Sequence, residues 1–330
     1  MVAQALSPDP PRLLPPADRC RFARMASASA LRPLLPLATA RANHLTTDWD
    51  NERIFVPWFL GRRFVEPSLD DLMPHIKWKS FLSASEPDRR DELITDAQQM
   101  LSEWLNGTVI KPRGVYGFWA ANAVDDDIVV YKDDARASVL VRFHMLRQQE
   151  PTADVGPTLS LADFVAPKDS FAPDYIGAFA VTTGIALDEV VGEYEARGDG
   201  RSGTIAKALG DWLAEAFAEF LNAKARNDWG YGDAAKDRGI RPAFGHPACP
   251  DPTEKAALFR LLHAPEIGIT LTDAFVTTPA SSVCGIYLAH PKAQYFDVGR
   301  IGLDQIEDYA RRKEMAMGEA ERWLAPNVGY

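Results

Sequence analysis

The longest regular pattern in the chain is an apolar stripe with helical spacing between residues 202 and 226. Its members recur three or four positions apart, as on one face of a helix: Ile205, Leu209, Trp212, Leu213, Ala216, Phe217, Phe220 and Leu221. The spacing predicts an amphipathic helix over 202–226. Glu215 and Glu219 are four residues apart, so they lie on one side of that helix, near the edge of the stripe. They are either solvated helix acids or part of a binding site.

Shorter stretches predict the other helices. Ser68 is typical of an N-cap, because two acids follow it in the first turn of a helix over 69–72. A second amphipathic pattern predicts a helix over Asp88–Leu105, ended by Asn106-Gly107. Similar patterns predict three further helices, at 253–262, 304–313 and 318–324.

The pattern changes to short β-branched and aromatic runs in the middle of the chain. These runs predict strands at 115–119, 128–131, 139–143 and 175–182, and a hairpin formed by 274–278 and 283–289. Asp-rich turns between the first three favour an antiparallel meander. Because strands and helices do not alternate regularly, we expect an α+β fold with a central, mostly antiparallel twisted sheet flanked by helices.

One of those turns is Asp125-Asp126-Asp127. Three acids in a row can hold a metal, but acids in a turn between strands are more often solvated. We therefore expect solvated carboxylates there and no metal site.

Residues 1–46 differ in composition from the rest, with many prolines, arginines, alanines and serines and few acids. We expect a disordered tail, followed by one domain over 47–330 whose folded part begins near Trp49. The stretch 19–41 also has the composition of a transit peptide, although its prolines would break the amphipathic helix that such peptides need. Met25 could equally be the true start.

The composition excludes several classes of function. The chain has 330 residues, 46% of them hydrophobic, which is enough to bury a core. Its net charge of −10 argues against binding to nucleic acid. The three cysteines lie far apart and form no Cys-x-x-Cys pair, so we expect neither zinc nor disulfides, as fits a reducing cytoplasm. Without an apolar run of about eighteen residues, we expect no membrane span.

Candidate chemistry lies in the run Arg241-Pro242-Ala243-Phe244-Gly245-His246-Pro247-Ala248-Cys249-Pro250-Asp251. Its prolines exclude a helix and hold Arg241, His246 and Cys249 in extended conformations. Gly245 permits a close approach or a left-handed turn. A rigid loop that carries a guanidinium and an imidazole can form a ligand cradle, or it can be a stiff connector between two elements.

This run resembles the Arg-Pro-Ala-x-Gly-Tyr-Pro-Ala-Cys-Pro signature of the activation domain of cobalamin-dependent methionine synthase. Motifs in the same order support the resemblance over residues 47–330: 114–122, 161–167, 174–182, 213–219, 307–313 and 323–327. The resemblance implies the fold of that domain and a site for S-adenosylmethionine lined by the loop after Arg241.

The resemblance also implies which residues contact the ligand: Glu215, Arg241, Ala243, Gly245, His246, Tyr295 and Phe296. The fork of Arg241 suits the ligand carboxylate, and Glu215 could balance the ammonium and the sulfonium. Ala243, Gly245 and His246 would contribute backbone groups. No residue is expected to act as a catalytic group.

The chain departs from the family pattern at four places. Lys77 stands where the family has an aspartate that binds the amino group, so it sets like charge against the ammonium unless it turns into solvent. His246 replaces a tyrosine, and Phe296 replaces the second of two consecutive tyrosines. The segment between Trp229 and Arg241 is shorter than in the family and has lost a glutamate.

The resemblance further implies a component of methionine synthase that cannot make methionine alone. None of the six histidines lies in the Asp-x-His-x-x-Gly pattern of cobalamin modules, so we expect cobalamin in trans on a partner subunit. The expected role is a freestanding reactivation subunit that supports reductive methylation of cob(II)alamin, with electrons from a flavodoxin-like or other donor.

The sequence leaves two other functions open. One is a non-catalytic homologue that caps a cobalamin protein without using S-adenosylmethionine, which Lys77 and the lost glutamate favour. The other is an independent methyltransferase, which lacks support because no Gly-x-Gly-x-Gly turn follows an opening strand.

Overall fold

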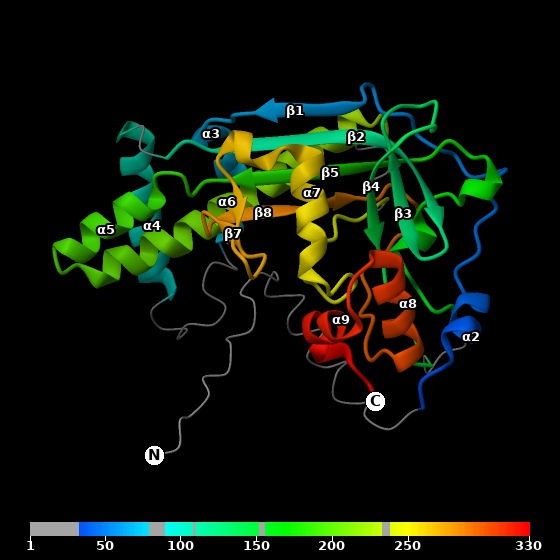
Figure 1. Cartoon of the computed structure of the whole chain (residues 1–330). Coiled ribbons are helices and arrows are strands. Elements are labelled where there is room, and N and C mark those ends of the chain that lie inside the picture. Colours follow the sequence, from blue (N-terminus) through cyan, green and yellow to red (C-terminus); the bar gives the residue numbers. More distant parts are fainter. Residues whose placement is uncertain (1–32, 79–89, 108–109, 152–155, 233–237) are drawn as a thin grey trace, which may run out of the picture. The chain divides into compact units, whose positions relative to one another are not determined.

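A six-stranded sheet forms the centre of the protein (Figure 1). The structure is a computed structural model and describes residues 33–78, 90–107, 110–151, 156–232 and 238–330. Its strands are β1 (Gly61–Val65), β2 (Arg113–Val124), β3 (Asp127–Tyr131), β4 (Val139–His144), β5 (Tyr175–Thr182) and β8 (Ser282–Tyr287). The long strand β2 pairs with β5 on one side and with β1 and β3 on the other, and every one of these ladders is antiparallel. The expected α+β fold is confirmed.

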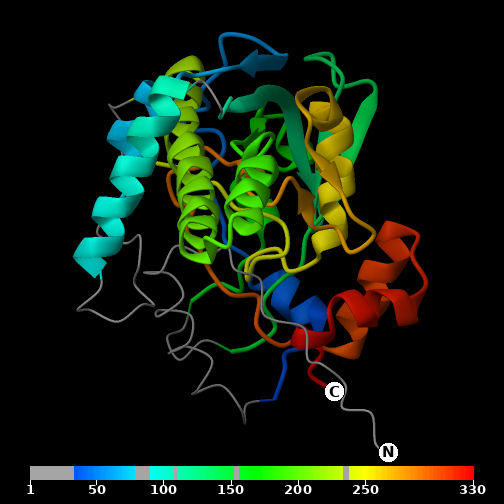
Figure 2. The same ribbon diagram turned by 90° about the vertical axis from the view of Figure 1, so that its left-hand side faces the viewer.

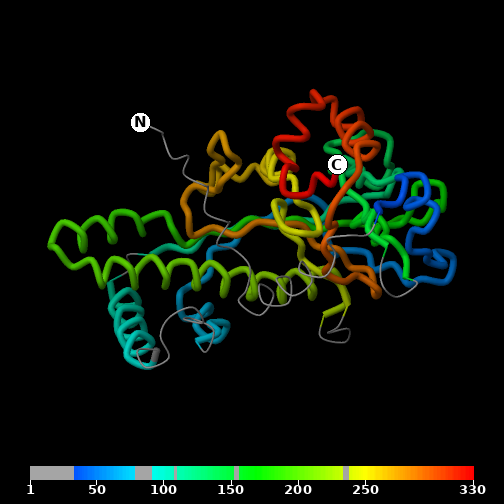
Figure 3. The backbone as a smooth tube through the Cα atoms, turned by 90° about the horizontal axis from the view of Figure 1, so that it is seen from below, coloured from blue at the N-terminus to red at the C-terminus, as the bar shows by residue number. Residues whose placement is uncertain are grey.

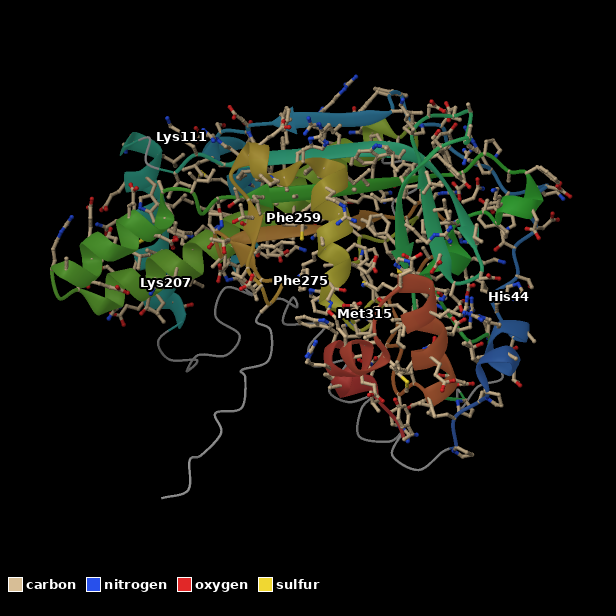
Figure 4. The ribbon with its side chains drawn as sticks, viewed as in Figure 1. His44, Lys111, Lys207, Phe259, Phe275 and Met315 are labelled. Atoms are coloured by element: carbon tan, nitrogen blue, oxygen red, sulfur yellow. The ribbon has the colours of Figure 1, made fainter. Side chains whose placement is uncertain are left out.

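The two faces of the sheet bury separate cores. Successive side chains of a strand point to opposite faces, so Ile176 and Ala178 of β5 join one core while Phe179 and Val181 join the other. Helix α7 (Lys255–Leu262) covers the first face. The 29-residue helix α6 (Gly200–Asp228) covers the second. Figures 2 and 3 show α6 and α7 on opposite sides of the sheet, and Figure 4 labels Phe259 on α7.

The described residues form six further α-helices: α2 (Leu37–Ala42), α3 (Leu69–Leu72), α4 (Arg90–Gly107), α5 (Leu187–Ala196), α8 (Leu303–Lys313) and α9 (Met317–Trp323). The expected cap of α3 is confirmed, because the Ser68 hydroxyl accepts the Asp71 N–H. Helix α5 was not predicted; its two buried residues, Leu187 and Val191, give too short a stripe to stand out. In the described part of the chain, no helix is long and apolar enough to cross a membrane.

The predicted hairpin of 274–278 with 283–289 is wrong. Strand β7 (Thr277–Thr278) pairs instead with β6 (Thr270–Leu271), and β8 pairs with β5. Five of the six residues of β8 are buried. The apolar strand therefore gains more burial beside the buried β5 than it would beside an exposed neighbour.

The predicted start of the folded part near Trp49 is also wrong. Helix α2 (Leu37–Ala42) already packs on the domain, with the side chains of Leu37 and Ala40 buried. Arg41 forms ion pairs of 2.7 Å with Asp126 and 2.6 Å with Asp308. The sequence did not predict these contacts, because the segment is rich in proline and its partners lie far away along the chain. The transit-peptide interpretation covers 19–41, of which 19–32 lie outside the described residues, and so does the alternative start at Met25.

The Asp125–Asp127 turn differs from its expected role. Asp126 and Asp127 are buried rather than solvated. Asp126 accepts a 2.8 Å bond from Nε of Arg147, whose two Nη atoms bind Asp163 at 2.6 and 2.8 Å. The Arg147 side chain is only 3% exposed. These acids are therefore partners of buried arginines that tie the β2–β3 turn to the rest of the domain.

We predict that Arg147→Met strongly destabilises the protein. The substitution removes the cation of the buried Asp163 and leaves Asp126 with Arg41 alone, so the free energy of unfolding should fall by about 3–5 kcal/mol in denaturant titrations. Arg197→Met, at a pair whose arginine is 66% exposed, is the control and should change it by no more than about 0.5 kcal/mol. Equal effects of the two substitutions would contradict this assignment.

Candidate functional site

The loop that carries Arg241 is fastened to the free edge of β8. Ile240 and Leu288 exchange two backbone hydrogen bonds of 2.9 and 3.0 Å, and the Ile286 N–H donates to the Pro242 carbonyl at 3.0 Å. A Cβ on Gly285 would lie 2.5 Å from that carbonyl oxygen, so only glycine permits this approach. Residues 240–242 thus run as a short extra strand, which fixes the backbone of Arg241.

The rest of the loop closes on itself. Gly245 has a φ of +88°, as expected for a left-handed turn, and its N–H donates to the Cys249 carbonyl at 2.9 Å. The Cys249 N–H donates to the His246 carbonyl at 2.9 Å, and its thiol donates to the Ala243 carbonyl at 3.0 Å. Phe244 is buried in the core. The loop is therefore rigid, as a ligand cradle requires.

The guanidinium of Arg241 faces two carboxylates of α6. Its Nη2 atom lies 3.2 Å from Oε2 of Glu219 and 3.8 Å from Oε2 of Glu215. The backbone N–H of Arg241 donates to the hydroxyl of Tyr295 at 3.1 Å. The structure thus brings together three of the expected site residues, Glu215, Arg241 and Tyr295, around a charged cluster on rigid elements.

The pKa of Glu215 depends on its burial and on the charged residues around it. Burial raises its pKa above the usual value, and the charge of Arg241 opposes that shift most strongly. Glu219 and Asp211 raise the pKa further, whereas Lys77 lowers it. Lys77 is exposed, yet its charge acts on Glu215, so it belongs to the surroundings of the site. A cation placed beside Glu215 would stabilise its charged form.

Other expected site residues occupy different surroundings. Phe296 is buried against Phe164, with ring centroids 6.4 Å apart, so it supports the site from the core. The neighbouring Tyr295 is 53% exposed, which leaves its ring accessible. His246 is half-buried at the turn of the loop. Residues 233–237, within the shortened segment before Arg241, lie outside the described residues.

Two residues near Arg241 were not assigned to the site from the sequence. The four-residue spacing placed Glu219 beside Glu215, but nothing in the pattern showed that both face one arginine. Tyr287 of β8 is buried, and its hydroxyl has no hydrogen-bond partner among the described residues. Burial raises the pKa of Tyr287, and the charges of Arg241 and Glu219 also act on it. Because Tyr287 lies on a core strand, the sequence gave no sign that it is close to Arg241.

Comparisons with known proteins identify the family and the fold. The family model described as the activation domain of vitamin B12 dependent methionine synthase matches residues 44–314. A crystal structure of the MetH reactivation domain bound to AdoHcy superposes with a TM-score of 0.86 at 41% sequence identity. That match covers 91% of this chain and 100% of the other.

Proposed function

The chain belongs to the family of vitamin B12-dependent methionine synthase activation domains, and we propose that it binds S-adenosylmethionine beside Arg241 to support reductive methylation of cobalamin. The observation that carries this proposal is the convergence of Arg241, Glu215 and Tyr295 at one rigid site. A similar structure binds AdoHcy, a ligand of the same chemical class.

The residues of the site fit the groups of this ligand. Arg241 would bind the carboxylate through its planar fork. Glu215 would lie close to the ammonium and the sulfonium, whose charge favours its ionised form. The half-exposed ring of Tyr295 offers an apolar surface next to the bound group. Backbone groups of Ala243, Gly245 and His246 would close the cradle. When bound, S-adenosylmethionine supplies a methyl group that reduced cobalamin accepts.

We further propose that cobalamin is held by a partner subunit, and that a flavodoxin-like or other donor supplies the electron. Binding without a covalent tether requires a docking surface with affinity of its own. The test is to mix this protein with a cobalamin-binding methionine synthase subunit, S-adenosylmethionine and a competent reductant, and to follow the visible spectrum. Loss of the cob(II)alamin absorption, dependent on this protein, supports the proposal. Ligand binding without that change would rule out the activation role, and a protein that binds no S-adenosylmethionine would favour the non-catalytic alternative.

Arg241→Ala should weaken binding of S-adenosylmethionine. The loss of a charge-assisted bond to the ligand carboxylate corresponds to about 1.5–3 kcal/mol, or roughly ten- to a hundredfold in Kd, measured by calorimetric titration. Arg201→Ala, at an arginine on the first turn of α6 whose side chain is 54% exposed, is the matched control and should bind as the wild type does. Wild-type affinity in the Arg241 variant would rule out this role.

Lys77→Asp should tighten binding of S-adenosylmethionine by about three- to tenfold, because it removes a cation that repels the ligand ammonium and adds an attractive charge. Lys207→Asp makes the same change of charge in the first half of α6, where the lysine pairs with Glu195 (Figure 4). It should leave the affinity unchanged. If both variants behave alike, Lys77 acts only through the net charge of the protein.

A further inference from the structure

We propose that Glu219 is a second ligand-binding carboxylate of this site, and that it gives the site a preference for the sulfonium of S-adenosylmethionine over the uncharged thioether of S-adenosylhomocysteine. This inference rests on the proposed function. It concerns how the same site distinguishes the methyl donor from the product left after methyl transfer.

The geometry places Glu219 in the path of the ligand. Its carboxylate accepts a 3.2 Å bond from Arg241 Nη2, which is closer than Glu215 at 3.8 Å. A ligand carboxylate that binds Nη2 of Arg241 at about 2.8 Å would compete with Glu219 for this space. The ligand ammonium, on the adjacent carbon atom, then comes close to both glutamates. Binding therefore replaces the Arg241–Glu219 ion pair by two others. Arg241 pairs with the ligand carboxylate, and Glu219 pairs with the ligand ammonium.

Glu219 is suited to this exchange. Its side chain is 39% exposed, against 18% for Arg241, so it borders solvent where a ligand can arrive. Within the described ranges, Arg241 is the cation with which Glu219 forms an ion pair. When the ligand carboxylate takes Arg241, the carboxylate of Glu219 needs a new cation, and the ligand brings one.

The charge of the whole cluster favours a positively charged ligand. The titratable groups that act on Glu215 are Arg241, Lys77, Glu219 and Asp211. With Glu215 itself, two cations and three carboxylates leave one negative charge in excess. S-adenosylmethionine carries an ammonium, a sulfonium and a carboxylate and has a net charge of +1. S-adenosylhomocysteine has no net charge, so it cannot offset the excess negative charge of the cluster.

The same charge difference assists turnover. When the methyl group leaves as a cation for a reduced acceptor, the electron pair of the broken C–S bond stays on sulfur, and the sulfonium becomes a neutral thioether. The product then leaves the excess negative charge of the cluster unbalanced. We therefore expect the product to bind more weakly than the methyl donor.

The test compares Kd values for both ligands by calorimetric titration of the full chain. The quantity measured is the ratio of the Kd for S-adenosylhomocysteine to that for S-adenosylmethionine. Glu219→Gln should lower this ratio about five- to tenfold, mainly by weakening S-adenosylmethionine. Glu219→Asp keeps the charge and should preserve most of the ratio. Glu189→Gln, at an exposed acid of α5, makes the same change of net charge and should leave the ratio unchanged.

Each other outcome overturns the inference. If Glu219→Gln weakens both ligands equally, Glu219 only positions Arg241. If it tightens both equally, Glu219 is only a competitor for the guanidinium. A wild-type protein that binds both ligands, with the same ratio in the Gln variant, contradicts this inference and leaves the proposed function intact. A wild-type protein that binds neither ligand contradicts the proposed function itself.

Discussion

The pairing of residues 240–242 with the edge of β8 is the constraint on which the site depends. Strand β8 is itself held by β5 in the middle of the sheet, and α6 is packed on the same sheet. The distances from Arg241 to Glu215 and Glu219 are therefore set by the packing of a helix on a sheet, not by a mobile loop. A binding site on such rigid elements loses little conformational entropy when a ligand arrives. Gly285 is essential to this arrangement because its missing side chain admits the Pro242 carbonyl.

The protein contains two kinds of charged cluster, and burial separates their roles. Arg147 is 3% exposed and meets Asp126 and Asp163 with full, short hydrogen bonds. The short bonds of such a buried cluster are costly to break, and the cluster holds segments of the domain together. Arg241 has longer contacts, and its two glutamates are 30% and 39% exposed. Ion pairs that are long and partly solvated can be replaced by pairs with a ligand at a small cost in free energy, as a binding site requires.

The sequence predicted those features that depend on neighbours along the chain. The helix over 202–226 was predicted from its periodicity, the strand at 175–182 from its β-branched and aromatic run, and the turn at Gly245 from its proline-rich setting. Apart from the missed helix α5, the errors have a common cause, because each involved a partner far away in the sequence. Strand β8 pairs with β5 rather than with a strand close to it in the sequence, and Asp126 pairs with Arg147. The resemblance to a family predicted a ligand site, but a pattern of residues could not show that Glu219 is closer to Arg241 than Glu215 is.

The lysine at position 77 is better understood with Glu219 in view. Lys77 acts on Glu215 and offsets part of its negative charge. If Glu215 were the only carboxylate near Arg241, a ligand with two cationic groups would find too little negative charge in the site. In the proposed site, Glu219 would supply the missing charge from the next turn of the same helix, where it already lies beside the guanidinium. The departure at position 77 therefore need not abolish the site, since the balance of charge can be kept by a neighbour on α6.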